Sequence, residues 1–241
     1  SYDDTVRHSI TKLSHYHFVS HKKYKKRVIQ LGENPNTVFN VGSLGAENVS
    51  NIIFLSKKIL EKKLKVKFER KIFLITINSF IEDKISIKEL LINLFRVLNK
   101  FKKVSFVFTM SNSDLKSDLI NKNIKYFCKT NRNSHYFKYL GANNYLSLMK
   151  ISNLVIGNSS SGILETPSLG IPTINIGTRQ EGRIFSKNII NCSGSYQSIY
   201  KSIKKTLSKN FAKKIKNVKN PLFKRNTSSQ IRRIIETKIL S

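Results

Sequence analysis

The sequence is poor in acidic residues, in cysteine and in long hydrophobic runs. Its 241 residues hold 14 Asp and Glu against 44 Lys and Arg, and only two cysteines, Cys128 and Cys192. Two cysteines this far apart exclude a disulfide framework and indicate buried, reduced thiols in a cytoplasmic protein. No apolar run approaches the length of a membrane span. We therefore expect a chain long enough to bury a full hydrophobic core, located in the cytoplasm.

The shortage of acids leaves a formal net charge of +30. Such a charge is typical of proteins that bind nucleic acids or anionic surfaces. However, the chain has 34 lysines and only 10 arginines, whereas nucleic-acid sites rely on Arg for bidentate contacts. No zinc-finger, RNP or other reader motif is present. We favour a solvated lysine surface and expect neither nucleic-acid nor membrane partners, while a basic nucleic-acid or anionic-surface binder stays an alternative.

The spacing of the histidines near the start of the chain does not indicate a metal site. Val6, Ile10, Leu13 and His17 follow a helical period near the start of the chain. His15 would diverge from His17 on such a helix, and no third ligand is placed by spacing. We expect no metal site.

Strand-like apolar runs alternate with helix-like segments along most of the chain. Strands are predicted at 37–41, 71–77, 104–110, 124–128, 153–156, 172–176 and 189–192. Helices are predicted at 47–64, 87–98, 114–123, 143–151, 161–169, 195–207 and 228–240, and a surface crossing at 208–227. This alternation with nearly continuous apolar strands indicates an α/β fold: a Rossmann-like parallel sheet covered by helices on both faces.

A serine-rich turn, residues 157–162, follows the strand at 153–156 and precedes a predicted helix. The first backbone N–H groups of a helix have no intrahelical partner, so such a turn attracts anions. The hydroxyls of Ser159, Ser160 and Ser161 add donors, and Glu165, one turn further on, suits the two hydroxyls of a ribose. The pattern points to a nucleoside diphosphate, although serine also caps helices without any ligand.

Four polar loops follow predicted strands, at 78–84, 111–114, 158–161 and 177–183. The ligands of a parallel α/β sheet bind beyond the carboxyl ends of its strands. We therefore expect these loops to meet in one crevice.

Several motifs occur together in one order along almost the whole chain. They are Asp3-Asp4, Arg7-His8, Lys12-Leu13-Ser14-His15, His17-Phe18, Leu31-Gly32-Glu33, Val41-Gly42, Asn112-Ser113-Asp114, Tyr145-Leu146-Ser147-Leu148, Gly157-Asn158-Ser159-Ser160-Ser161-Gly162 with Glu165, and Asn175-Ile176-Gly177 with Arg179-Gln180 and Gly182-Arg183. This set resembles the UDP-N-acetylglucosamine 2-epimerases, specifically the hydrolysing branch of sialic-acid and nonulosonate pathways.

The resemblance implies a two-domain fold like that of the GT-B glycosyltransferases, of which this chain would be the C-terminal portion. Residues 1–20 would end a missing N-terminal Rossmann-like domain, 21–225 would form the UDP-binding domain, and 226–241 would cross back toward the missing half. The reaction would remove the C2 proton, eliminate UDP and hydrate the glycal, on UDP-GlcNAc or on a 2,4-diacetamido-trideoxy analogue. No cofactor is implied. The expected partners are the UDP-sugar, the N-terminal domain of the same or a separate chain, and further copies in a homo-oligomer.

The resemblance also implies which residues of this sequence form the site, from their positions in the matching motifs. The turn Asn158-Ser159-Ser160-Ser161-Gly162 would hold the diphosphate and Glu165 the ribose. The remaining expected binding residues are Asn78, Leu140, Tyr145, Leu148, Arg179 and Arg183. Of these, Leu140, Tyr145 and Leu148 also fit a purely structural helix core, and Arg179 and Arg183 also fit a loop-fixing or surface role. One of Asp3 and Asp4 would match a catalytic carboxylate facing the sugar.

The sequence departs from the family after the strand at 71–77, where Asn78-Ser79 stands in place of a His-Pro pair, and Ser111 stands where Pro is usual. An amide cannot act as a general acid. Three hypotheses follow: the nucleotide-binding half of a hydrolysing 2-epimerase whose chain alone is inactive, a catalytically dead UDP-sugar-binding module, or the basic binder above.

Overall fold

The computed structural model describes residues 2–79, 85–111 and 117–238, with side chains from residue 5 onward. The chain forms two compact units: unit 1 is 1–51 with 220–241, and unit 2 is 52–219. The boundaries expected from the sequence were at 20 and 225. Each unit is considered by itself. Within the described residues no helix is both long and apolar enough to cross a membrane.

Unit 2 is built on a parallel six-stranded sheet in the described part of the chain. Its spatial order is β5-β4-β3-β6-β7-β8. The strands are β3 (Lys71–Thr76), β4 (Val104–Thr109), β5 (Ser134–Phe137), β6 (Leu154–Gly157), β7 (Thr173–Ile176) and β8 (Ile189–Cys192). Counted along the chain from β3, this order is 3-2-1-4-5-6, that of a Rossmann sheet, and it reverses between β3 and β6. The predicted Rossmann-like parallel α/β sheet is thus confirmed.

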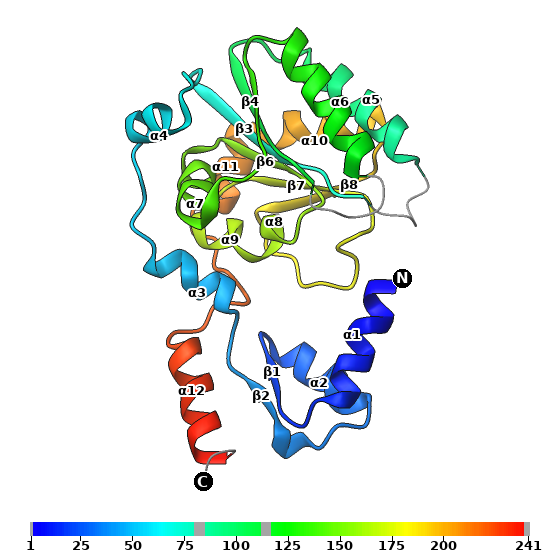
Figure 1. Cartoon of the computed structure of the whole chain (residues 1–241), viewed down its shortest axis with the longest axis vertical. Helices are drawn as coiled ribbons and strands as arrows, with labels where there is room; N and C mark the ends of the chain where they lie inside the picture. Colours follow the sequence, from blue (N-terminus) through cyan, green and yellow to red (C-terminus); the bar gives the residue numbers. More distant parts are fainter. Residues whose placement is uncertain (1, 80–84, 112–116, 239–241) are drawn as a thin grey trace. The chain divides into compact units, whose positions relative to one another are not determined.

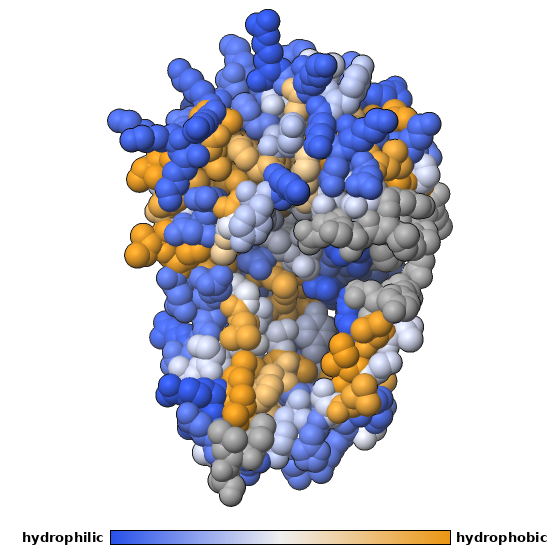
Figure 2. Space-filling model, in the orientation of Figure 1, coloured by the Kyte–Doolittle hydropathy of each residue, from blue (hydrophilic) through white to orange (hydrophobic). Residues whose placement is uncertain are grey.

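Helices cover both faces of this sheet (Figure 1). One face carries α5 (Ile87–Leu98), α6 (Ser117–Thr130) and α10 (Tyr196–Thr206), with α11 (Lys209–Ile215) packed against α10. The other face carries α7 (Gly141–Ile151), α8 (Ser161–Leu164) and α9 (Thr166–Leu169), and α4 (Lys57–Leu64) packs on α7. In Figure 2, hydrophilic side chains cover much of the visible surface over α4, α5 and α6.

The main core lies between the sheet and the layer of α5, α6 and α10. Phe73, Phe106 and Phe108 of the strands are nearly or fully buried there, together with Leu94 of α5. Burying each such side chain contributes on the order of 2 kcal/mol. The helix α5 begins where the Ser86 hydroxyl accepts a hydrogen bond from the Glu89 N–H, a Ser-x-x-Glu start.

Several predicted elements were wrong. Residues 124–128 belong to α6, because Ile120, Ile124 and Phe127 are buried at helical spacing; a short apolar run does not distinguish a strand from a helix. The strand in this region is β5, which lies at the edge of the sheet and has only Ser134 buried. The surface crossing at 208–227 contains α11, which the Ser208 hydroxyl caps.

Two predicted helices are each divided in two. The segment 47–64 forms α3 (Leu44–Asn51) in unit 1 and α4 in unit 2, because the Ser56 hydroxyl accepts from the Ile59 N–H and starts a new helix. The segment 161–169 forms α8 and α9, divided at Glu165. Pro167, which has no backbone N–H, lies in the first turn of α9. The bounds of the other predicted helices and strands agree with the observed bounds within a few residues.

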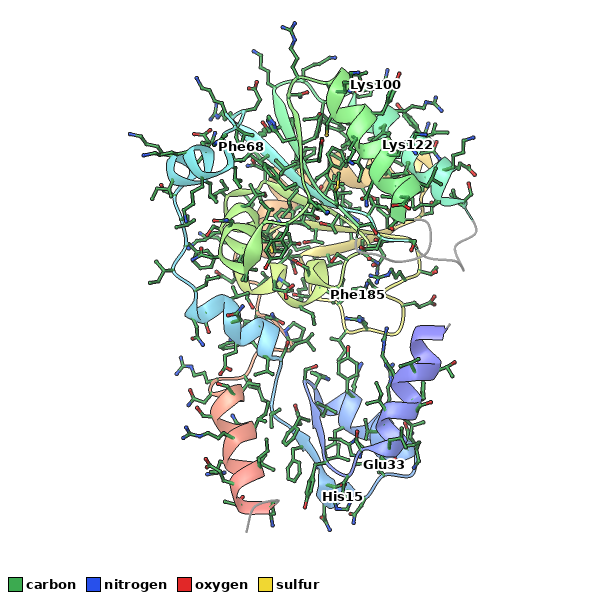
Figure 3. The ribbon with its side chains drawn as sticks, viewed as in Figure 1. His15, Glu33, Phe68, Lys100, Lys122 and Phe185 are labelled. Carbon is green, nitrogen blue, oxygen red and sulfur yellow. The ribbon has the colours of Figure 1, made fainter. Side chains whose placement is uncertain are left out.

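Unit 1 contains α1 (Tyr2–Leu13), β1 (His17–Val19), α2 (Lys22–Gln30), η1 (Pro35–Thr37), β2 (Val38–Asn40), α3 and α12 (Thr227–Lys238). The strands β1 and β2 form a two-stranded parallel sheet. The helical period predicted to run through His17 stops at Leu13, and His17 instead begins β1, where its Nε2 lies 3.2 Å from Glu33 Oε2. Figure 3 labels Glu33, which also accepts from Lys12 at 2.7 Å.

Gly157 is required where β6 ends beside β3. Its φ is +146°, and a Cβ there would lie 1.8 Å from the carbonyl oxygen of Thr76. Backbone atoms of the paired strand cannot move away without breaking the ladder. Gly170, with φ +65°, has open space around the same position.

We therefore expect Gly157→Ala to lower the free energy of unfolding by more than about 4 kcal/mol, or to prevent folding. The control Gly170→Ala suffers only the backbone strain, about 1–2 kcal/mol. Urea unfolding followed by circular dichroism measures both. Equal losses in the two variants would contradict the close approach at Gly157.

Candidate functional site

A pocket of about 370 Å³ opens in unit 2 at the carboxyl ends of β3 and β6. This is the point where the strand order reverses, and ligands of open α/β sheets bind in that crevice. The described lining residues are Thr76, Asn78, Thr109, Met110, Phe137, Lys138, Tyr139, Leu140, Gly141, Ala142, Tyr145, Ser159, Ser160, Ser161 and Arg179.

The serine turn forms one wall of this pocket. The backbone N–H groups of Ser159 and Ser160 form no hydrogen bond with any group that the structure describes, whereas Ser161 N–H donates to Ser159 Oγ at 3.4 Å. Because α8 has only four residues, it carries little macrodipole. The attraction for an anion thus comes from these N–H groups, the hydroxyls and the nearby positive side chains.

Asn158 connects the turn to its neighbours. Its Nδ2 donates to the Asn78 carbonyl at 2.8 Å, and its Oδ1 accepts from the Asn78 N–H at 2.7 Å. Its own carbonyl accepts from Arg179 Nη1 at 3.0 Å and from Gln180 Nε2 at 2.8 Å. Asn158 is 1% exposed, and all its polar groups bond within the protein. It therefore positions three loops instead of lining the pocket.

The positive side of the pocket is formed by Arg179 and Lys138. Arg179 is held by Asn158 and reaches the lining from the loop after β7. Lys138 lies on the loop after β5 and is exposed. Arg183 is half-buried on the same loop as Arg179 and does not line the pocket. Two cations therefore accompany the uncompensated N–H groups of the turn.

A buried carboxyl lies behind the turn. The Tyr145 hydroxyl is 2.7 Å from Ser161 Oγ. Burial raises the pKa of Glu165 to about 7, against an opposing hydrogen bond from Ser161. Glu165 Oε2 is buried without a hydrogen-bond partner among the described residues. Burial likewise raises the pKa of Tyr145, which keeps its phenol protonated.

The structure brings many of the predicted residues together. Asn78, Leu140, Tyr145, Ser159, Ser160, Ser161 and Arg179 line one pocket. Leu148 is fully buried in the core, and Gly162 packs beneath the turn, where a Cβ would lie 3.2 Å from Thr173 Cγ2. Of the four predicted loops, parts of 78–84 and 111–114 lie outside the described residues, as do the side chains of Asp3 and Asp4.

The stretch 137–142, from the end of β5 to the start of α7, was missed as a contributor apart from Leu140. It supplies Phe137, Lys138 and Tyr139, of which Tyr139 is 88% exposed. The available signal was an aromatic and basic cluster followed by Gly141, whose φ is +71°. It was overlooked because the strand was assigned to 124–128, which left this loop without a strand before it.

The described lining contains no carboxylate and no imidazole. Nor do three or more His, Cys, Asp or Glu side chains come together as metal ligands within the described ranges. Hydroxyls, an amide, two cations and aromatic rings remain. This donor set can bind phosphates and stack a flat ring, but it offers no general base.

Comparison with known proteins agrees with this type of site. Residues 1–236 match the family model described as UDP-N-acetylglucosamine 2-epimerase. The chain is 46% identical over 192 residues to a GDP/UDP-N,N'-diacetylbacillosamine 2-epimerase (hydrolyzing) of Campylobacter jejuni, which covers 78% of this chain and 50% of that protein. It is 39% identical over 245 residues to polysialic acid biosynthesis protein P7 of Escherichia coli, covering 100% of this chain and 61% of that protein. The chain thus spans about half to three fifths of these relatives.

Solved structures share the fold. S. aureus MnaA in complex with UDP superposes with a TM-score of 0.75 at 14% identity, over 94% of this chain and 61% of that one. The UDP-GlcNAc 2-epimerase of Methanocaldococcus jannaschii, in complex with UDP-GlcNAc and UDP, gives a TM-score of 0.73 at 21% identity, over 93% and 62%.

The raised pKa of Glu165 predicts a pH-dependent stability. Between the usual value of 4.5 and about 7, the folded chain holds a proton that the unfolded chain has released. The free energy of unfolding should thus fall as pH rises across this window, by about 2–3 kcal/mol. Glu165→Gln, which stays neutral, should remove that part of the decline. Chemical denaturation at pH 5, 6, 7 and 8 measures it, and identical slopes in both proteins would contradict a buried, uncompensated carboxyl.

Proposed function

Since the chain belongs to the UDP-N-acetylglucosamine 2-epimerase family, we propose that unit 2 is the UDP-binding part of a hydrolysing 2-epimerase. The observation that carries this proposal is the pocket at the strand-order reversal, walled by a serine turn with free N–H groups. Its volume of about 370 Å³ is in the range of small-ligand sites. The hydrolysing type is supported by the 46% identity to the Campylobacter jejuni relative.

In this proposal the diphosphate lies on the serine turn. The N–H groups of Ser159 and Ser160, the hydroxyls and Arg179 would donate to its oxygens, since charge-assisted hydrogen bonds are the stronger ones. The uracil would lie against Tyr139, Leu140 and the other residues of the loop after β5. The ribose hydroxyls would donate to Glu165, which lies behind the serine turn and outside the described lining; its unpartnered carboxyl oxygen supports such a role.

We further propose that this pocket binds the substrate but does not move its protons. The implied reaction removes the C2 proton, breaks the bond from C1 to UDP and adds water to the glycal. A carboxyl or imidazole suits each proton transfer, yet the described lining contains neither, and Asn78 offers only an amide. The acids would then come from elsewhere: from Asp3 or Asp4, and from a second Rossmann-like domain. This is consistent with the chain spanning 50% and 61% of its relatives.

The substrate would be UDP-GlcNAc or its 2,4-diacetamido-trideoxy analogue, and the product the free manno-type sugar with UDP. The division into a nucleotide-binding domain and the end of another domain, the homo-oligomer and the cytoplasmic location remain predictions.

Isothermal titration calorimetry with UDP tests the binding. We expect saturable binding by the wild type, and a Kd about 5–10 times higher for Ser160→Ala and for Glu165→Ala, because each removes a hydrogen bond to a charged or buried group. Ser229→Ala, an exposed serine of α12 in unit 1, serves as the matched control and should leave the Kd unchanged. A cooperatively folded chain that binds no UDP at millimolar concentration would overturn the proposal.

Turnover is tested separately by proton NMR, with the chain supplied with UDP-GlcNAc or UDP-N,N'-diacetylbacillosamine. We expect no release of UDP above the buffer rate, because the described pocket lacks an acid and a base. The Campylobacter jejuni relative, given its own substrate, is the positive control. Release of UDP by this chain alone would contradict the assignment of the acids to another domain.

A further inference from the structure

A chain of hydroxyl groups runs along the carboxyl edge of the sheet in unit 2. Thr109 Oγ1 of β4 bonds to Thr76 Oγ1 of β3. The Tyr145 hydroxyl of α7 interacts with Thr76 and lies 2.7 Å from Ser161 Oγ. Ser161 also lies near Glu165, whose pKa it lowers against the effect of burial. These groups come from separate elements, and several of them line the pocket.

The direction of the hydrogen bonds in this chain matters because Ser161 has only one proton. A serine hydroxyl donates once and accepts up to twice. If Tyr145 accepted from Ser161, the serine proton would point away from the pocket and from Glu165. If Tyr145 donates, the Ser161 proton is free for Glu165 or for an anion in the pocket. A phenol whose pKa is raised by burial keeps its proton to donate.

We propose that Tyr145 is a positioning residue. Its hydroxyl donates to Ser161 and so directs the serine O–H toward the pocket, where a diphosphate oxygen of the nucleotide accepts that hydrogen bond. The inference rests on the proposed UDP binding at this site and adds the residue that fixes its donor. Tyr145 would not touch the phosphate. Its contribution to affinity passes entirely through Ser161.

The ring of Tyr145 packs in the pocket wall irrespective of its hydroxyl, so a structural role must be separated from the positioning role. Tyr145→Phe keeps the ring and removes only the hydroxyl. If the role is purely structural, Tyr145→Phe should change the Kd by the same factor with Ser161 present and with Ser161→Ala. A positioning effect requires that hydroxyl and disappears without it.

A double-mutant cycle measures the difference. UDP titrations by calorimetry compare the wild type, Tyr145→Phe, Ser161→Ala and the double variant. Tyr145→Phe should raise the Kd about fivefold in the wild-type background, and less than twofold in the Ser161→Ala background. Tyr126→Phe, an exposed tyrosine of α6 at 71% exposure, is the control and should leave the Kd unchanged. Thermal unfolding of each variant establishes that all are folded at the titration temperature.

The outcomes separate this inference from the proposed function. If the wild type binds UDP and Tyr145→Phe raises the Kd by the same factor in both backgrounds, the positioning role is overturned. The proposed binding site is then still supported. A folded wild type that binds no UDP overturns both. If Tyr145→Phe weakens UDP binding only in the background that retains Ser161, the positioning role is supported.

Discussion

The Asn158 hydrogen bonds hold together the loops from which the pocket is built. Its side chain pairs with both backbone groups of Asn78, at the end of β3. Its carbonyl accepts from Arg179 and Gln180 on the loop after β7. Because buried polar groups that lose their partner cost about 1–3 kcal/mol each, these bonds fix the three loops relative to one another. The serine turn therefore starts from a defined position at the reversal of the strand order.

The turn N–H groups beside the pocket lack partners in the described part of the chain, whereas the polar groups of Asn158 behind them are bonded. The N–H groups of Ser159 and Ser160 and the Glu165 Oε2 have no partner among the described residues. Buried polar groups in proteins are mostly hydrogen-bonded, so the unpartnered Glu165 Oε2 requires an explanation. A ligand with both anionic oxygens and hydroxyls would satisfy donors and acceptor together. A nucleoside diphosphate has both.

Much of the fold could be predicted because its signals are local. The apolar strands β3, β4, β6 and β7 and the amphipathic α5 follow directly from hydrophobic period, and their alternation indicates the parallel sheet. Edge strand β5 could not be found in this way, since its buried residue is Ser134 and its exposed residue is Tyr136, the reverse of an apolar core face. The division of 161–169 at Glu165 also escaped, although Pro167 lies in the first turn of α9.

The candidate site, like the fold, was predicted only in part from the sequence. The serine turn and the loops that carry Asn78 and Arg179 were predicted from polar residues at strand ends. Asn78 and Arg179 themselves were implied by the family resemblance, and both line the pocket with the turn. The loop after β5 was largely missed as a consequence of the misplaced strand. The structural role of Asn158 could not be inferred, because the sequence does not reveal that its amide faces the backbone of a residue 80 positions away.

We propose that the crevice at the strand-order reversal binds UDP through the serine turn. The most direct test is a ¹H–¹⁵N NMR titration of the isotope-labelled chain with UDP, after assignment of its backbone amides. We expect the largest chemical-shift changes at the amides of Ser159 and Ser160 and at residues 138–142. Changes confined to the lysine-rich helices α10 and α11, or absent throughout, would contradict it.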